Sequence, residues 1–240
     1  MEYMEMLARL GVGSAHPGGF SATVEQLREH PIEPGCRVLE VGCGTGRTAC
    51  YLAKMGCIVT ALDIRDDMLA KARRRADAEE AAVTFVQGSI EALPFVGGSF
   101  DAVIAESVTI FADVPLALSE YARVLCSGGT LYDREIIAVR PLPAEGLAAV
   151  KDFYRVRRLY NMSEWKELLL GAGFASSSIW RPSEFPVMTV EDSVRYPDLH
   201  QELDPDVYEN EAVWETAKTY DDIMSAYHAS FGFGLLIGRK

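Results

Sequence analysis

No apolar run in the chain reaches the ~18–20 residues that a membrane-spanning helix needs. The first residues, Met1-Glu2-Tyr3-Met4-Glu5-Met6, lack the basic start and apolar block of a secretion signal. Basic residues are also scarce, since 23 Lys and Arg stand against 35 Asp and Glu and give a net charge of −12. A surface of that sign repels phosphate backbones. We therefore expect a soluble, cytoplasmic protein with no membrane span and no nucleic-acid partner.

Cysteine and histidine give no sign of a metal site or of a disulfide framework. The five cysteines form an odd-numbered set without a C-x-x-C pair, and we expect them to stay reduced. The four histidines are scattered along the chain without an H-x-x-x-H pair. No metal is therefore predicted.

What the sequence does have is the composition of an ordinary globular protein. Its 240 residues, 49% hydrophobic and 24% charged, suffice for one large domain or one domain with insertions. Short β-branched runs alternate with helical stretches between residues 36 and 139. This alternation predicts an α/β fold in which helices cover both faces of a parallel sheet. Strands are expected at 36–41, 58–64, 83–87, 101–106 and 129–138, and helices at 47–55, 66–78 and 115–125.

The pattern changes after residue 140. We expect one domain, 1–240, with an N-terminal helical cap at 1–30, a core at 33–140 and a helical insertion at 183–228. Beyond residue 140, helices are expected at 145–160, 163–172 and 207–227, and strands at 176–180 and 231–238.

The strongest local signal is a glycine-rich turn that joins a buried strand to a helix. It reads V-L-E-V-G-C-G-T-G-R at residues 38–47. Glycines at alternate positions let the backbone approach a ligand closely, and the helix behind them offers free N–H groups. A nucleotide-like ligand is indicated, although tight turns also use glycine for structural reasons alone.

Two acids strengthen this interpretation. Glu40 stands two residues before the first glycine, and Asp63 ends the second strand, where a carboxylate can bind ribose hydroxyls. Asp63 could instead cap the next helix, but Asp66 and Asp67 already offer caps there. The ribose role is therefore favoured.

With these motifs, the stretch from residue 33 to residue 138 resembles the class I S-adenosylmethionine-dependent methyltransferases. It is most similar to the small-molecule branch that contains ubiquinone and menaquinone biosynthesis enzymes. Further motifs that match are G-S-I at 88–90, S-F-D-A-V at 99–103 and L-C-S-G-G-T-L at 125–131, where Ser127 replaces the usual proline. The resemblance implies a Rossmann-like, doubly wound and mostly parallel sheet of seven strands. It also implies methyl transfer from S-adenosylmethionine, which leaves S-adenosylhomocysteine.

The same resemblance assigns a set of residues to the cofactor. The glycines would line its methionine and ribose portion with Glu40 beneath it, Asp63 would hold the ribose, and apolar residues would surround the adenine. Glu106 would end the fourth strand beside the reacting methyl group, or else be a solvated acid. The implied set is Glu40, Gly42, Cys43, Gly44, Gly46, Asp63, Ile64, Met68, Gly88, Ser89, Ile90 and Glu106.

Three other functions stay open. An NAD-dependent dehydrogenase shares the strand, the turn and the acid, but the turn lacks G-x-G-x-x-G spacing and no tyrosine has a lysine four residues later. A nucleic-acid (RNA) methyltransferase is disfavoured, because E-S-V-T at 106–109 does not match the Asn/Asp-Pro-Pro-aromatic motif of nucleobase methylases. The basic clusters at 71–75 and 155–158 also lack interleaved aromatics, and the first is expected to be a solvated helix face. A noncatalytic regulator that binds S-adenosylmethionine would have the same glycines, and only turnover distinguishes it.

The methyl acceptor is expected to be a small molecule. If its reacting atom must lose a proton, Glu106, His16 or Asp133 could accept it, with no order of preference among them. Aromatic residues of the C-terminal part could line its pocket, although each alone is more often a core residue. They are Phe153, Tyr154, Tyr160, Trp165, Trp180, Phe185, Tyr208, Trp214 and Tyr220.

Residues 1–20 and about 183–228 are expected to form a helical lid over the carboxyl ends of the strands. Ligands bind at those ends in open α/β sheets, and neither the glycine turn nor Asp63 covers the methyl side. The first segment has apolar residues at helical spacing, and the helix expected at 207–227 is amphipathic. Within the first segment, His16 could close over the cofactor or simply lie in a turn.

Overall fold

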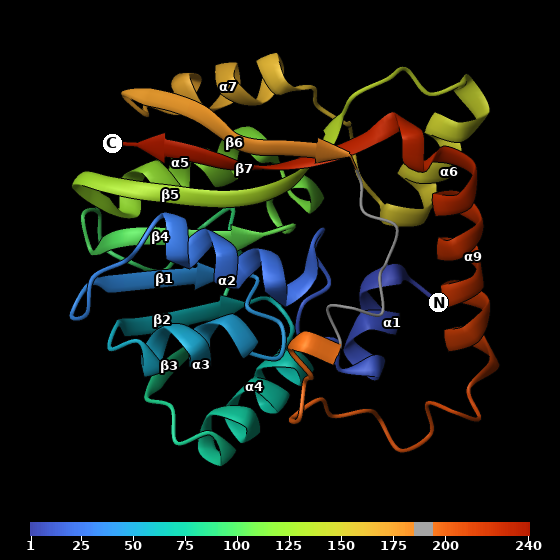
Figure 1. The fold of residues 1–240 in the computed structure, drawn as a ribbon, viewed down its shortest axis with the longest axis horizontal. Coiled ribbons are helices and arrows are strands. Elements are labelled where there is room, and N and C mark those ends of the chain that lie inside the picture. Colours follow the sequence, from blue (N-terminus) through green and yellow to red (C-terminus); the bar gives the residue numbers. More distant parts are fainter. Residues whose placement is uncertain (185–193) are drawn as a thin grey trace.

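The computed structural model of the protein describes residues 1–184 and 194–240 and contains one mixed sheet (Figure 1). Its strands are β1 (Arg37–Val41), β2 (Ile58–Asp63), β3 (Val83–Gln87), β4 (Phe100–Glu106), β5 (Leu125–Ala138), β6 (Ser176–Glu184) and β7 (Phe231–Arg239). The strand order is β3-β2-β1-β4-β5-β7-β6. β1 to β5 pair in parallel, and β7 is antiparallel to both of its neighbours. The predicted doubly wound, mostly parallel sheet of seven strands is confirmed.

The helices mostly begin and end near their predicted bounds. Helix α6 is six residues shorter at its C-terminal end than expected from 145–160, because Arg155 takes a left-handed φ of 57° and ends it. The helices are α1 (Tyr3–Leu10), α2 (Gly19–Glu29), α3 (Arg47–Lys54), α4 (Asp66–Ala78), α5 (Val114–Val124), α6 (Ala144–Tyr154), α7 (Met162–Gly171) and α9 (Glu211–Tyr227), with short 3-10 helices η1 (Thr109–Phe111) and η2 (His228–Ser230).

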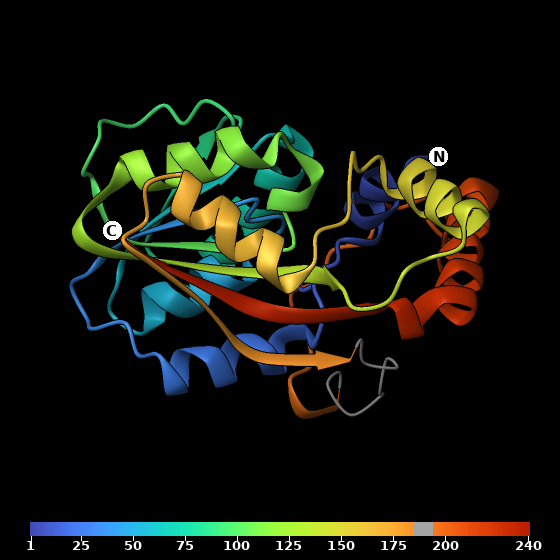
Figure 2. The same cartoon turned by 90° about the horizontal axis from the view of Figure 1, so that it is seen from above.

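An apolar core lies on each face of the sheet. On one face, Leu27 of α2, Leu52 of α3 and Leu69 of α4 belong to one buried cluster. On the other, Leu118 of α5 and Trp165 of α7 are fully buried in a second. Figure 2 shows α5 and α7 on one side of the strands and α2 and α3 on the other. Both faces are therefore removed from water, which explains why the parallel strands read as continuous apolar runs.

A further group of helices lies beyond the carboxyl ends of the parallel strands (Figure 1). It consists of α1, α6 and α9, and together with residues 194–210 we call it the cap. Met6 of α1 is buried against Val213 of α9, and Val150 of α6 is buried against Ile223 of α9. Each cap helix therefore hides its apolar face against another cap helix.

The cap contains α1, from the segment 1–20, and α9, from the segment 183–228, both of which were expected in a lid. Helix α2, within the expected cap at 1–30, instead packs on a face of the sheet. Helix α6, which follows β5, was not expected in the cap. Residues 185–193 of the expected insertion, including Phe185, lie outside the described residues. No helix in the described part of the chain is long and apolar enough to cross a membrane.

Candidate functional site

The glycine-rich turn lies at the carboxyl end of β1, and its two sides differ in how tightly they are packed. Gly42 has a φ of +62°, and a Cβ there would lie 2.4 Å from Cγ2 of Val108, so only glycine fits against the segment after β4. Gly44 also has a positive φ, yet a Cβ there would meet no atom within 4 Å. Gly46 is the N-cap of α3, whose first N–H groups have no partner within the helix. The turn is thus tightly packed on one side and open on the other.

Asp63, at the end of β2, fixes the shape of this turn. Its Oδ2 accepts a hydrogen bond of 2.9 Å from the backbone N–H of Gly44, and its Oδ1 accepts one of 2.9 Å from Arg65 N–H. Burial raises the pKa of Asp63, and the backbone N–H groups of Arg65 and Gly44 oppose that rise. Gly88, after β3, donates its N–H to the Asp63 carbonyl. The carboxylate therefore stands beside the open side of Gly44, next to the exit of β3.

Glu40 is buried behind the turn, and one of its carboxylate oxygens, Oε2, accepts no hydrogen bond from the described residues. Burial raises the pKa of Glu40 well above its usual value, and the charges of Glu106 and Asp63 raise it further. A cationic group placed at this point would relieve the cost of the unsatisfied oxygen.

Glu106, at the end of β4, is bound by the N-terminal part of the chain. Its Oε1 accepts a hydrogen bond of 2.5 Å from Thr23 Oγ1, and its Oε2 accepts one of 2.8 Å from Thr48 Oγ1. His16 Nε2 lies 3.5 Å from the same Oε1. Burial alone would raise the pKa of Glu106, but the charge of His16 and the Thr23 hydroxyl hold it below its usual value. Glu106 therefore ties the segment before α2 to the end of β4.

The residues predicted to surround an adenine differ in exposure. Met68 and Ile90 are buried, and Cys43 is buried within the turn. Ile64, directly after β2, has 67% of its surface exposed. Ser89 lies beside them, where its Oγ accepts from the backbone N–H of Glu91. An exposed isoleucine next to Asp63 offers an apolar surface to a bound ring.

Lys71 of α4 holds the cap against the core. Its Nζ donates to the carbonyl oxygens of Ala8 and Glu202 at 2.7 and 2.8 Å, and to Asp204 Oδ1 at 2.7 Å. Arg74, on the same helix, forms a two-armed pair with the Glu202 carboxylate. We call residues 196–206, which receive these contacts, the strap.

Arg75 joins the strap to the glycine-rich turn. Its guanidinium donates to both carboxylate oxygens of Asp198, at 2.7 and 2.8 Å, and to the Thr45 carbonyl at 2.9 Å. Asp198 has a lowered pKa, because this pairing outweighs the effect of burial. The expectation that the basic cluster of α4 is a solvated face is therefore wrong for Lys71 and Arg75, which are both buried. Asp204 and Asp198, which bind Lys71 and Arg75, lie more than 120 residues away in the sequence, so no local pattern predicted these contacts.

Asp133 lies in the core, below η1, rather than at the open side of the turn. It shares one face of β5 with Glu135, and both are fully buried. Burial raises the pKa of Asp133 to about 7 and that of Glu135 well above its usual value. Glu135 Oε1 accepts a hydrogen bond of 3.2 Å from Ile110 N–H. This pair supports η1, which follows β4.

Five aromatic rings meet between η1 and the cap. The ring centroid of Tyr3 lies 4.9 Å from that of Tyr154, 5.5 Å from Phe153, 5.9 Å from Tyr220 and 6.5 Å from Phe111. Of the aromatic candidates, Phe153, Tyr154 and Tyr220 thus come together. Sequence reasoning missed Tyr3 and Phe111 as their partners, because the two lie far from the C-terminal part in the chain.

The remaining described aromatic candidates lie elsewhere. Trp165 is fully buried in the core below α7, next to Tyr160. Trp180 packs edge-on against His30. Tyr208 and Trp214 are exposed and stack on each other. These five residues do not join the ring cluster.

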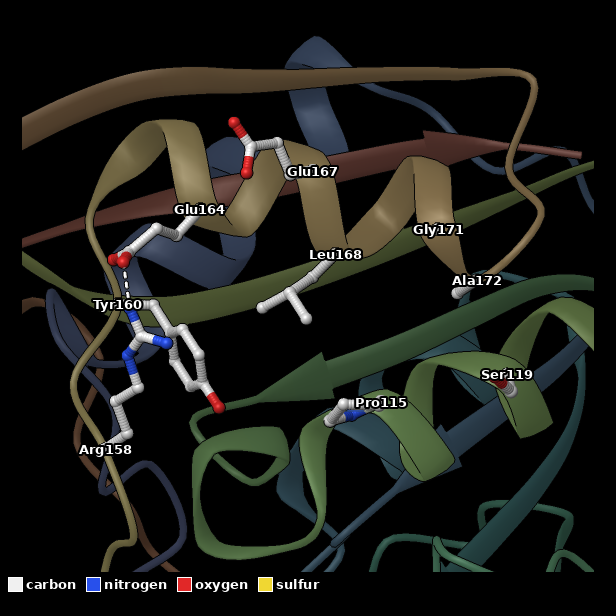
Figure 3. Close-up of a pocket in the computed structure, with 9 residues that line it drawn as sticks. All are labelled: Pro115, Ser119, Arg158, Tyr160, Glu164, Glu167, Leu168, Gly171 and Ala172. Carbon is white, nitrogen blue, oxygen red and sulfur yellow. Dashed lines mark hydrogen bonds and ion pairs between the residues drawn. The ribbon is translucent and has the colours of Figure 1, made fainter.

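A groove of about 460 Å³ lies between α5 and α7 (Figure 3). It shares no residue with the predicted cofactor set. Arg158 is already paired with Glu164 there, and its guanidinium lies over the Tyr160 ring. Within the described residues, no group of three or more His, Cys, Asp or Glu side chains could hold a metal ion.

Comparison with known proteins gives both sequence and structural relatives. A family model described as a methyltransferase domain matches residues 39–133. The chain is 35% identical over 242 residues to the uncharacterized methyltransferase YodH of Bacillus subtilis, and the alignment covers 99% of each chain. It is 38% identical over 150 residues to the ubiquinone/menaquinone biosynthesis C-methyltransferase UbiE of Methylobacterium nodulans, covering 60% of this chain and 58% of that protein.

Among solved structures, phosphoethanolamine N-methyltransferase 2 of Haemonchus contortus, in complex with S-adenosyl-L-methionine, has a TM-score of 0.77. The sequences are 19% identical, and the match covers 99% of this chain but 57% of that chain. The likeness therefore shows a shared fold along the whole described chain, cap included.

Proposed function

The chain belongs to the class I S-adenosylmethionine-dependent methyltransferases, and we propose that it methylates a small-molecule acceptor by in-line displacement, with S-adenosylmethionine bound at the glycine-rich turn. The open side of Gly44, where Asp63 accepts a hydrogen bond from the Gly44 N–H, is the observation that best supports this site. S-adenosylmethionine supplies an activated methyl group on a sulfonium.

The residues around the turn suit the parts of this cofactor. Glu40 would accept a hydrogen bond from its ammonium group, which satisfies the orphaned oxygen. Asp63 would accept from the ribose hydroxyls, and the exposed Ile64 would cover one face of the adenine. Cys43, Gly88, Ser89 and Ile90 would border the rest of the site, together with Gly42, Gly46, Met68 and Glu106.

The protein's part in such a displacement is alignment and the exclusion of water. Correct orientation of two bound reactants can lower a barrier by about 7–11 kcal/mol. The turn and Asp63 hold one reactant rigidly, and the cap covers the carboxyl ends of the strands, where water must be excluded. No protein nucleophile is required for this chemistry.

A small acceptor is favoured over nucleic acid by the basic groups of α4. Lys71, Arg74 and Arg75 are bound to strap residues, so they are not available to phosphates. The net charge of −12 also opposes a polyanion. The relative UbiE is named as a C-methyltransferase of ubiquinone and menaquinone biosynthesis. Its name supports a small-molecule acceptor for this chain as well.

Cofactor binding is tested by titrating S-adenosylhomocysteine into the protein in a calorimeter. Asp63→Ala should weaken binding by roughly 1.5–3 kcal/mol, the range for hydrogen bonds to charged groups. Gly44→Val should abolish it, because the side chain enters the open space. Asp66→Ala is the matched control, since Asp66 is an exposed acid of the first turn of α4, and it should bind normally. If the native chain and all three variants bind S-adenosylhomocysteine with equal affinity, the cofactor does not bind at the glycine-rich turn.

The acceptor class is tested with S-adenosylmethionine labelled in its methyl group. Cell extract is separated into small molecules, protein and RNA, and each fraction is incubated with the enzyme and with Gly44→Val. We expect label from the native enzyme alone, in the small-molecule fraction. Label in RNA would contradict the proposed acceptor, and binding of S-adenosylhomocysteine without turnover on any fraction would favour a regulator.

A further inference from the structure

Tyr3, the first residue of α1, fills a slot made of four other aromatic side chains. We call Phe111 of η1, Phe153 and Tyr154 of α6 and Tyr220 of α9 the aromatic slot. The Tyr3 ring lies nearly parallel to Tyr220, at 10°, and to Phe111, at 24°, while Tyr154 meets it edge-on at 76°. This combination of parallel and edge-on neighbours is the geometry in which a flat aromatic ring is held best.

The surroundings of the slot are apolar. Burial raises the pKa of Tyr3, and the neighbouring Tyr220 adds to the effect. Phe111 and Tyr154 also line a second, apolar pocket, whose other residues are Ile110, Ile136, Val150, Val156, Leu159, Met224 and Phe231. This pocket is small, about 20 Å³, so a ring bound in the slot would have apolar side chains rather than free space beside it.

The slot lies one 3-10 turn away from the glycine-rich turn. Val108 contacts the position of Gly42 so closely that a Cβ would not fit. Phe111 N–H donates to the Val108 carbonyl at 3.2 Å, so both residues belong to the same turn after β4. The segment after β4 thus has one residue against the proposed cofactor site and another in the slot.

Tyr3 can leave the slot if only the first turn of α1 moves. The N-cap of α1, Glu2, makes no side-chain capping bond. Further along α1, Met6 is buried against the cap and the Ala8 carbonyl is bound by Lys71. Removal of the Tyr3 ring would therefore leave a cavity between anchored walls rather than a collapsed helix.

We propose that the aromatic slot binds the methyl acceptor, that the acceptor carries a planar aromatic ring, and that Tyr3 occupies the slot as a stand-in while the acceptor is absent. This inference rests on the proposed function, because only a methyltransferase has a methyl acceptor. It adds to that function the binding site of the acceptor, its chemical class and the residue that competes with it. An incoming ring replaces the stacking contacts that Tyr3 gives up, so the exchange needs little net energy.

The slot is tested first by filling the cavity that Tyr3→Ala creates, with p-cresol as the probe. Apolar cavities between rigid walls bind small aromatic molecules. p-Cresol should raise the Tm of Tyr3→Ala and leave that of Met6→Ala unchanged, because Met6 packs with Val207 and Val213 and none of the four slot residues joins that cluster. Tyr3→Phe, which keeps the ring, should not respond either. Tyr3→Leu replaces Tyr3→Ala if the latter does not fold. An equal response of the Tyr3 and Met6 variants would overturn the proposal.

Competition with Tyr3 is tested on the protein loaded with S-adenosylhomocysteine. A site that is filled by its own side chain shows an apparent affinity reduced by the fraction of time it is open. p-Cresol should therefore bind Tyr3→Ala about tenfold more tightly than the native chain, and Tyr220→Ala should reverse the gain. Equal affinities, or preferential binding of tetramethylammonium, would overturn the inference. Failure of S-adenosylhomocysteine to bind would instead count against the proposed function, because p-cresol rescue of Tyr3→Ala does not depend on it.

Discussion

The sheet core and the junction between cap and core are stabilised in different ways. In the core, Leu39 of β1, Leu62 of β2 and Leu131 of β5 are completely removed from water. At the junction, Lys71, Arg74 and Arg75 of α4 bind carbonyl and carboxylate oxygens of the strap and of α1. Apolar burial does not depend on salt or pH in the way that ion pairs do.

This difference indicates that α1 and the strap can open while the core stays folded. Segments held by few apolar contacts and by partly solvated charges belong to the low-stability end of a structure. Helices α1 and α9 share an apolar cluster with the strap. Helices α6 and α9, in contrast, also pack against Ile136 of β5 and Phe231 of β7. A methyltransferase needs such a division, because its reactants must enter a site that is closed during the reaction.

The largest expected effect comes from the core. Leu39→Ala removes a fully buried side chain from β1 and should lower the free energy of unfolding by about 2–5 kcal/mol. Urea unfolding followed by circular dichroism measures this. Leu116→Ala, on the exposed side of α5, is the control and should change little. An unchanged free energy of unfolding in Leu39→Ala would contradict the importance of this buried side chain.

The next effect comes from the junction and should be local. Lys71→Met removes three hydrogen bonds, and hydrogen bonds to a charged group each make a net contribution of about 1.5–3 kcal/mol to stability. Hydrogen exchange should speed up in α1 and in the strap but stay unchanged in β1 and β2. Arg73→Met is the matched control, because Arg73 is an exposed cation on the same helix. Faster exchange throughout the sheet would show that cap and core unfold together.

The smallest effect is a pH response of opposite sign in the two regions. The pKa of Asp198 is lowered, so the stability it gives the cap is present above about pH 4, the range of an ordinary carboxyl, and is lost on acidification. Burial raises the pKa of Asp133, so the folded chain holds a proton that the unfolded chain releases. Stability from Asp133 therefore falls as the pH rises above the range of an ordinary carboxyl, about pH 4.

Two variants measure this contrast by thermal unfolding. Asp133→Asn removes the buried ionisation, and its Tm relative to the native chain should be higher at pH 8 than at pH 5. Asp198→Asn should be less stable than the native chain at pH 7, and the difference should shrink as the pH falls below about 4. Parallel pH profiles for both variants and the native chain would show that neither shift matters for stability.

The same contrast explains which features the sequence predicted. Local properties of the sequence, namely the period of its apolar residues and the glycines between elements, predicted the sheet and its order of elements. They also predicted the bounds of helix Asp66–Ala78. The position of Asp63 next to Gly44 follows from the family motif. The partners of Lys71 and Arg75 could not be predicted, because an ion pair between distant segments leaves no local pattern. For the same reason, the meeting of Tyr3 with Tyr220 was not visible before the fold was known.

Arg75 has a consequence for the timing of turnover. One guanidinium binds both the Thr45 carbonyl in the glycine-rich turn and the Asp198 carboxylate in the strap. If a bound ligand strengthens the first contact and thereby the second, thermodynamic reciprocity requires that a docked strap strengthens ligand binding by the same free energy. The spent product is then held until the strap undocks. Release of S-adenosylhomocysteine, rather than the displacement itself, becomes the step that this arginine sets.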